Sequence, residues 1–225
     1  MRKSGRLSGK VALVTGGNTG VGRAAAVALA REGADVAIAY RNRHRYAAET
    51  RDLIEAQGCA CLVLPADLRL DGECRRAVGR VMDRFGRLDA LVLAHAARPA
   101  PVELPDLTPE RLADTFQTGA LSYFYLIQAA LPALERGTSI VTTVGGGPEP
   151  QAVDRQAAAG AVAALTRALA GDLAAKGVRI NAVVPGGAEE SAGSYVFLAS
   201  DQSAPMTGRL LRPGTWPGVG ENSLK

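Results

Sequence analysis

The chain has few aromatic residues, few histidines and an odd number of cysteines, and each shortage excludes a class of function. Aromatic residues make up 4% of the 225 positions, too few for the stacking surfaces that bind single-stranded nucleic acid. The histidines His44 and His95 and the cysteines Cys59, Cys61 and Cys74 show no metal-ligand spacing, so no metal site is expected. We interpret the cysteines as buried thiols in a reducing compartment.

Long apolar segments and runs of like charge are also missing. No stretch approaches the roughly 18 uncharged apolar residues of a membrane-spanning helix, and no apolar run of a signal peptide follows the basic start MRKSGRLSGK. The net charge of +4 comes mostly from scattered arginines, which is typical of a solvated surface rather than a nucleic-acid patch. We therefore expect a cytoplasmic protein with no membrane or nucleic-acid partner.

What the chain does contain is a regular alternation of short apolar runs and longer helical patterns, with 47% hydrophobic residues overall. Strands that are apolar on both faces and alternate with helices predict βαβ units and a covered parallel sheet. We predict one α/β domain over residues 1–225, with a flexible N-terminus over 1–9 and a C-terminal tail over 213–225. Strands are expected near 10–16, 35–40, 61–66, 89–94, 139–144, 179–184 and 208–212, and helices near 20–32, 43–57, 70–85, 108–135, 152–176 and 189–200.

A glycine-rich stretch follows the first predicted strand, in VTGGNTGVGRAAAVALA. Gly16, Gly20 and Gly22 stand between a strand and a helix, where glycines let backbone N–H groups and the positive end of the helix approach a pyrophosphate. The spacing is G-x-x-x-G-x-G, and its position in a βαβ unit favours dinucleotide binding. The alternative is a glycine-rich turn without a ligand.

The end of the second predicted strand predicts which dinucleotide is favoured. An acidic residue at this point would bind the ribose 2′-hydroxyl of NAD. This chain instead reads AYRNR, with Tyr40, Arg41 and Arg43 and no acid. Because an arginine can pair with a 2′-phosphate, NADP(H) is the favoured cofactor. The alternative is a solvent-exposed loop arginine.

Several motifs, in order over nearly the whole chain, resemble the short-chain dehydrogenase/reductase family. They are TGGNTGVG, ADL at 66–68, GRLDALV at 86–92, SYFYLIQAALP at 122–132, GVRINAVVPGG at 177–187, and SYVFLASD with a following TG within 194–208. The resemblance implies a Rossmann-type, doubly wound parallel sheet of about seven strands with helices on both faces, usually assembled into dimers or tetramers.

The resemblance also implies where a cofactor would lie. Asp67 would lie near the adenine ring, whereas Pro185 and Gly186 would lie near the nicotinamide. The predicted cofactor-binding residues are Gly16, Asn18, Thr19, Gly20, Val21, Gly22, Tyr40, Arg41, Asp67, Leu68 and Ala94.

The catalytic positions of the family are occupied here by residues without the required chemistry. The family's Asn, Ser and Tyr-x-x-x-Lys pair fall on Gly119, Gly145, Arg155 and Ala159, and its Asn-Asn-Ala-Gly stretch on LAHA at 93–96. A guanidinium does not release its proton near neutral pH, so Arg155 cannot replace the tyrosine, and we predict no catalytic residue. Loss of the ribose-binding lysine leaves weak cofactor binding, or none, as alternatives to firm NADP(H) binding.

Further positions bear on catalysis. The segment before Arg155 is shortened, so Thr142 or Thr143 is an alternative to Gly145 at the serine position. His95, Glu149 and Tyr123 are candidate replacement acids; the competing interpretations are a strand-end polar residue, a solvated loop acid and helix packing. The loop and helices that cover the substrate in the family are absent, because PGGAEESAGSYVFLASD runs directly into the last predicted helix.

Two helices provide the expected assembly surface. The one near 152–176 has few charges in its first turns, and the one near 108–135 carries LSYFYLI; the resemblance places the main subunit interface there. The alternative is that the helix near 152–176 is rich in alanine only because alanine is a good helix former.

The sequence supports three functional hypotheses. The first is a catalytically silent pseudoenzyme acting as a subunit of a homo-oligomer or of a heteromer with an active relative. The second is an NADP(H)-dependent oxidoreductase similar to carbonyl or ketoacyl reductases, or a non-redox enzyme, that uses non-standard residues. The third is a sensor of the NADPH/NADP ratio.

Overall fold

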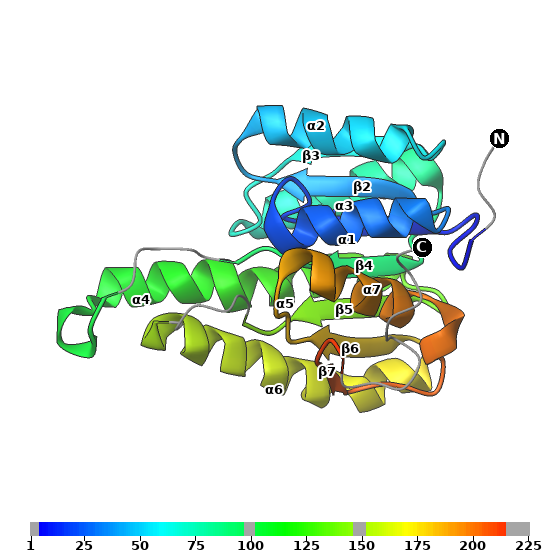
Figure 1. Ribbon diagram of the computed structural model, residues 1–225. Helices are drawn as coiled ribbons and strands as arrows, with labels where there is room; N and C mark the ends of the chain where they lie inside the picture. Colours follow the sequence, from blue (N-terminus) through cyan, green and yellow to red (C-terminus); the bar gives the residue numbers. More distant parts are fainter. Residues whose placement is uncertain (1–4, 97–101, 146–151, 215–225) are drawn as a thin grey trace.

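The computed structural model describes residues 5–96, 102–145 and 152–214. Seven strands form one parallel sheet in the order β3-β2-β1-β4-β5-β6-β7 (Figure 1). The predicted doubly wound sheet is therefore confirmed. The strand order reverses between β1 and β4, and in such sheets ligands bind beyond the carboxyl ends of the strands at this point. The strands are β1 Val11–Thr15, β2 Asp35–Tyr40, β3 Cys61–Pro65, β4 Ala90–Leu93, β5 Ser139–Thr143, β6 Arg179–Val183 and β7 Leu210–Leu211.

Helices cover both faces of the sheet and create two hydrophobic cores. One core contains residues of α3, α5 and α6, and the other contains residues of α1, α2 and α7. Side chains along a strand point alternately to the two faces of the sheet and so enter the two cores in turn. For example, Leu13 belongs to the first core and Val14 to the second. The helices are α1 Gly20–Arg31, α2 His44–Glu55, α3 Asp71–Phe85, α4 Pro109–Phe116, α5 Ser122–Ala130, α6 Val153–Ala175 and α7 Ala188–Ala199.

The helix predicted over 108–135 is not regular. A π-helical turn, η2 (Gln117–Leu121), separates α4 from α5, and a 3-10 turn, η3 (Leu131–Ala133), ends the segment. Thr108 caps α4 by accepting a hydrogen bond from the backbone N–H of Arg111. A π turn changes the direction in which neighbouring residues point and is frequent at functional sites. Here the turn contains Gly119.

Residues 5–9, part of the N-terminal segment 1–9 that was expected to be flexible, contact the folded domain. Leu7 is 1% exposed and belongs to the core shared by α1 and α7. Its backbone N–H donates to the carbonyl of Glu32, and Arg6 pairs with the Glu32 carboxylate. These contacts place the segment beside the end of α1. Most of the predicted tail, residues 215–225, lies outside the described residues.

Helix α6 is long and apolar enough, by length and composition alone, to cross a membrane, which the sequence analysis did not expect. In the fold, α6 packs against the sheet through Val162, Leu165 and Leu173. Only 33% of its most apolar window is buried. The exposed side of α6 consists largely of alanine and glycine. One such helix is weak evidence for a membrane span, and α6 contacts the sheet along one side.

Candidate functional site

A groove of about 670 Å³ lies at the carboxyl ends of the strands, beside the switch point between β1 and β4. The glycine loop forms one wall, and the segments that follow β2 and β3 form the other. A smaller pocket of about 60 Å³ adjoins it, and residues 94–96 line both. The two cavities together form an elongated site across the switch point.

The glycine loop is shaped by contacts that exclude side chains. Gly16 has a φ of +65°, and a Cβ atom on Gly22 would lie 2.4 Å from the Gly16 carbonyl oxygen. Thr19, the N-cap of α1, makes no side-chain capping bond, and the first turn of α1 has no acidic residue. The N–H groups at the start of α1 are therefore not capped by a side chain, and the groove beside them suits an anion.

The loop after β2 is fixed to the glycine loop. The side-chain amide of Asn18 donates to the Asn42 carbonyl oxygen at 2.8 Å. The Tyr40 hydroxyl lies 2.8 Å from Nδ1 of His44. Arg41 lines the groove with an exposed side chain and makes no ion pair among the described residues. Its guanidinium is therefore available to a ligand in the groove.

The loop after β3 contains an ion pair that sequence reasoning missed. Arg69 donates to both carboxylate oxygens of Asp67, the shortest contact being 2.6 Å, and it also pairs with Asp114 on α4. The hydrogen bonds from Arg69 lower the pKa of the Asp67 carboxyl. The carboxylate expected near an adenine ring already has a partner, and the signal available in the sequence was an arginine two positions later.

The structure brings most of the predicted cofactor residues together. Val21 lies instead in the smaller pocket, and Gly22 packs behind the loop and lines neither cavity. Thr118 was not predicted, yet it lines the groove with a buried hydroxyl that has no hydrogen-bond partner in the described part of the chain. The predicted residues that line the groove are Gly16, Asn18, Thr19, Gly20, Tyr40, Arg41, Asp67, Leu68 and Ala94.

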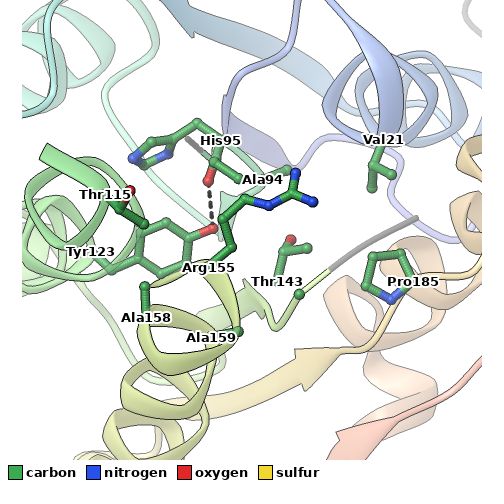
Figure 2. Close-up of a pocket in the computed structure, with 13 residues that line it drawn as sticks. Val21, Ala94, His95, Thr115, Tyr123, Thr143, Arg155, Ala158, Ala159 and Pro185 are labelled. Atoms are coloured by element: carbon green, nitrogen blue, oxygen red, sulfur yellow. Dashed lines mark hydrogen bonds between the residues drawn. The ribbon is translucent and has the colours of Figure 1, made fainter. Parts of the chain in front are cut away.

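The four positions aligned with a catalytic set converge in the smaller pocket. Gly119 from η2 and Gly145 after β5 line it. Arg155 and Ala159 from α6 also line it (Figure 2). Two of the four have no side chain beyond hydrogen, one is a methyl group and one is a guanidinium. None of the four can supply a proton near neutral pH.

The hydroxyls near this pocket are engaged elsewhere. Thr143 lines the pocket, but its hydroxyl lies 2.7 Å from that of Tyr195, which is fully buried on α7. Burial raises the pKa of Tyr195. Thr142 points away from the pocket and lies 2.8 Å from the Thr166 hydroxyl. Of the two threonines proposed for the serine position, only Thr143 reaches the site.

His95 is held in a complete chain of hydrogen bonds. The Ala94 N–H donates to the Thr15 hydroxyl, and the Ser122 hydroxyl donates to the Thr118 carbonyl. Nδ1 of His95 lies 2.6 Å from the first hydroxyl, and Nε2 lies 2.7 Å from the second. The Thr15 hydroxyl accepts from Ala94 and donates its proton to Nδ1. The Ser122 hydroxyl donates to Thr118 and accepts from Nε2–H, so the ring carries one proton and is neutral.

Electrostatics support this assignment. Burial, with a smaller contribution from Arg41, lowers the pKa of His95 to about 4. Both ring nitrogens are used within the fold. His95 acts here as a structural link between the end of β4 and α5, and it is poorly suited to donate a proton.

The other two candidate acids are Tyr123 and Glu149. Tyr123 is 1% exposed, its hydroxyl donates to the carbonyls of Leu93 and His95 at 2.9 Å, and burial raises its pKa. Figure 2 shows the bond to His95. Glu149 lies outside the described residues. Tyr123 therefore has a packing role.

A buried ion pair borders the pocket. Asp154 is 1% exposed, and its Oδ2 accepts hydrogen bonds from Arg111 at 3.1 Å and from Thr115 at 2.9 Å. Burial opposes ionisation of Asp154, but these bonds hold its pKa below the usual value. The pair joins α4 to the first turn of α6 and thereby positions the neighbouring Arg155.

Comparison with known proteins identifies the family. Residues 16–189 match the family described as Enoyl-(Acyl carrier protein) reductase. The chain is 38% identical to the uncharacterized oxidoreductase YhdF of Bacillus subtilis, over 93% of this chain and 84% of that protein. This chain belongs to the short-chain dehydrogenase/reductase family.

Other family members agree in sequence and in structure. The chain is 34% identical to NADPH-dependent aldehyde reductase 1, chloroplastic, of Arabidopsis thaliana, over 93% of this chain and 86% of that protein. A short chain dehydrogenase from Burkholderia cenocepacia in complex with NADP has a TM-score of 0.85 and 32% identity, with 92% of this chain and 97% of that chain covered. Carveol dehydrogenase from Mycobacterium avium in complex with NAD has a TM-score of 0.86 and 25% identity, with coverages of 93% and 97%.

Part of the family fold is shorter in this member. The alignment with YhdF spans 244 positions, more than the 225 residues of this chain, so that relative has residues without a counterpart here. The connection from β6 to α7 consists only of residues 184–187. Gly187 begins α7 directly, and its N–H donates to the Glu190 carboxylate. The described chain has no covering segment between β6 and α7, as the sequence predicts.

Proposed function

We propose that this chain is a short-chain dehydrogenase/reductase that binds NADP(H) without the family's proton-transfer chemistry and acts as a subunit of an oligomer. One observation carries the proposal: the four aligned catalytic positions meet in one pocket, and none of them has a suitable acid. General acid–base catalysis typically contributes about 10²–10⁴-fold to such reactions. The missing segment after β6 would leave the pocket open to water, which weakens electrostatic catalysis further.

The residues of the groove fit a dinucleotide with a 2′-phosphate. The N–H groups at the start of α1 would bind the pyrophosphate, and Arg41 would bind the 2′-phosphate. The unpartnered hydroxyl of Thr118 faces the same groove. A bound nicotinamide would supply hydride chemistry, but this chain's own residues would only bind and orient the cofactor. The names of the Arabidopsis relative and of the Burkholderia structure support the choice of NADP(H).

An apolar surface on α5 and α6 supports the assembly part of the proposal. Leu121, Phe124 and Leu131 are exposed at helical spacing along the α5 segment. A stripe of small residues runs along the outer side of α6: Ala157, Gly160, Ala164, Ala168, Gly171 and Ala175. Small side chains allow a second helix to approach closely. A second copy of this chain, or an active relative in the cytoplasm, would cover this surface.

Thermal unfolding with NADPH, NADP⁺, NADH and NAD⁺ tests the cofactor part. We expect the phosphorylated pair to raise the stability most, by about 2.7 kcal/mol at a hundredfold excess over Kd. Arg41→Ala should remove the preference for the phosphorylated pair. Arg45→Ala is the matched control, because Arg45 is exposed on α2 and does not line the groove. Equal shifts with all four nucleotides would contradict the role of Arg41.

A carbonyl-reduction assay tests the catalytic part. With a panel of ketones and aldehydes and NADPH, we expect turnover near the uncatalysed background. Turnover at ordinary enzyme rates would favour the alternative, an oxidoreductase that uses non-standard residues. The relatives that are named oxidoreductases support this alternative. The hydroxyl pair of Thr143 and Tyr195 is then the first to test, because Thr143 lines the pocket. In that case Tyr195→Phe would lower the activity.

A further inference from the structure

We infer that Arg155 makes this chain bind NADPH in preference to NADP⁺. The inference rests on the proposed NADP(H) binding and adds a selection between the two redox forms. The oxidised nicotinamide ring carries a positive charge and the reduced ring is neutral. A cation beside the ring therefore repels the oxidised form and not the reduced form.

The side chain of Arg155 lines the smaller pocket. Arg155 lies in the first turns of α6, and Figure 2 shows its side chain extending across the pocket, away from Tyr123 and toward Val21. Its Nε atom is buried and has no hydrogen-bond partner in the described part of the chain. The group thus extends into the cavity, and no hydrogen bond or ion pair to another side chain holds it among residues 5–96, 102–145 and 152–214.

The second step is the lack of a compensating charge. Among residues 5–96, 102–145 and 152–214, Arg155 makes no ion pair, although it neighbours Asp154 in sequence. The Asp154 carboxylate is occupied by Arg111 and Thr115 from α4. His95 is neutral, and much of the remaining lining is apolar. The charge of Arg155 therefore has no compensating charge among the described residues, and at short range it repels another cation even where water reaches the pocket.

The third step connects the pocket to the groove. The two cavities share residues 94–96, whereas Arg41 lines only the larger groove. A dinucleotide whose pyrophosphate lies at the start of α1 and whose adenosine lies toward Arg41 directs its other half to the smaller pocket. The nicotinamide would then lie next to Arg155.

The volume of the pocket does not change this argument. At about 60 Å³, the pocket requires the long side chain of Arg155 to move aside when a ring enters. That movement has the same cost for both redox forms, and so does any contact of the guanidinium with the pyrophosphate. The two redox forms differ in the charge of the ring, so the change in their affinity ratio when the charge of Arg155 is removed reports the proximity of Arg155 to the ring.

Isothermal titration calorimetry tests the inference, with NADPH, NADP⁺ and adenosine 2′,5′-bisphosphate as separate probes. The bisphosphate reports the adenosine end alone. For the unmodified chain we expect NADPH to bind at least about tenfold more tightly than NADP⁺. Arg155→Gln should reduce the ratio to within about twofold, and Arg155→Lys, which keeps the charge, should preserve most of it. The affinity for the bisphosphate should be equal in all three proteins.

The outcomes separate this inference from the proposed function. Equal affinities for NADPH and NADP⁺ in the unmodified chain overturn the inference and leave cofactor binding intact. A preference that persists in Arg155→Gln also overturns it, because another group must then be responsible. If none of the three probes binds, both proposals fall. Unfolding without ligand verifies that each variant folds, and Arg155→Met repeats the removal of the charge if Arg155→Gln does not fold.

Discussion

Nε2 of His95 lies 2.7 Å from the Ser122 hydroxyl, which in turn donates to the backbone of η2. This contact ties the end of β4 to the helix that contains Gly119. It also consumes the one proton that a neutral imidazole can donate. His95 lines the candidate site, but its hydrogen bonds give it a structural role.

The first prediction concerns pH. Because burial lowers the pKa of His95 to about 4, the unfolded chain, with a histidine pKa near 6.5, takes up a proton first as the pH falls. The contribution of His95 to stability is complete above about pH 6.5 and is lost between there and about pH 4, amounting to about 3 kcal/mol. Chemical denaturation at several pH values measures it, and His95→Gln should flatten this dependence.

Nitrogen NMR of the imidazole checks the same prediction directly. At pH 7 the His95 ring should be neutral with its proton on Nε2. His44→Gln assigns the signals, because His44 and His95 are the histidines of the chain. A His95 ring that titrates near pH 6.5 would contradict the prediction.

The second prediction concerns the buried pair of Asp154 and Arg111. Asp154→Ala leaves a guanidinium that is 18% exposed without its carboxylate partner, and we expect a loss of about 3–5 kcal/mol in the free energy of unfolding. Asp114→Ala, on the same helix as Arg111, is the matched control. Asp114 is 61% exposed, so its loss should cost less than about 1 kcal/mol. Urea denaturation of both variants measures the difference, and equal losses would contradict the argument.

The third prediction concerns the glycine loop. In Gly22→Ala the new methyl group would meet the Gly16 carbonyl oxygen at 2.4 Å, so the variant should be less stable and should lose affinity for NADPH. Gly79→Ala, within α3, places its methyl group in open space. That control should gain about 0.5–1 kcal/mol, because alanine is the better helix former. Thermal unfolding distinguishes the two directions of change.

The fourth prediction concerns assembly. Phe124 is 47% exposed within the apolar surface of α5. Phe124→Glu places a charge there and should convert the oligomer to monomers. Leu53→Glu is the control, since Leu53 is similarly exposed, at 40%, on α2. Sedimentation velocity measures both, and a monomeric unmodified chain would contradict the proposed surface.

The elements of the fold were predictable because their signals are local. Apolar runs such as VALVT and SIVTT, and the glycine loop after the first of them, depend on neighbouring residues alone. The doubly wound arrangement of the sheet was implied by the family resemblance, and the structure supplied the order of its strands. The irregular turn at Gly119 was not predictable, because a π turn has no periodicity that distinguishes it from the helices around it.

The sequence by itself determined the alternation of strands and helices, the glycine loop after β1 and the presence of Arg155 and Ala159 where the family resemblance predicts a tyrosine and a lysine. Only the tertiary structure decided what surrounds them. The neutral state of His95, the pair of Asp67 with Arg69 and the burial of Asp154 against Arg111 depend on distances between residues far apart in the chain or on the folding of a loop. Protonation and pairing respond to burial and to the nearest charges in space. The fold, rather than the order of residues, therefore decided which polar groups remain available to a ligand.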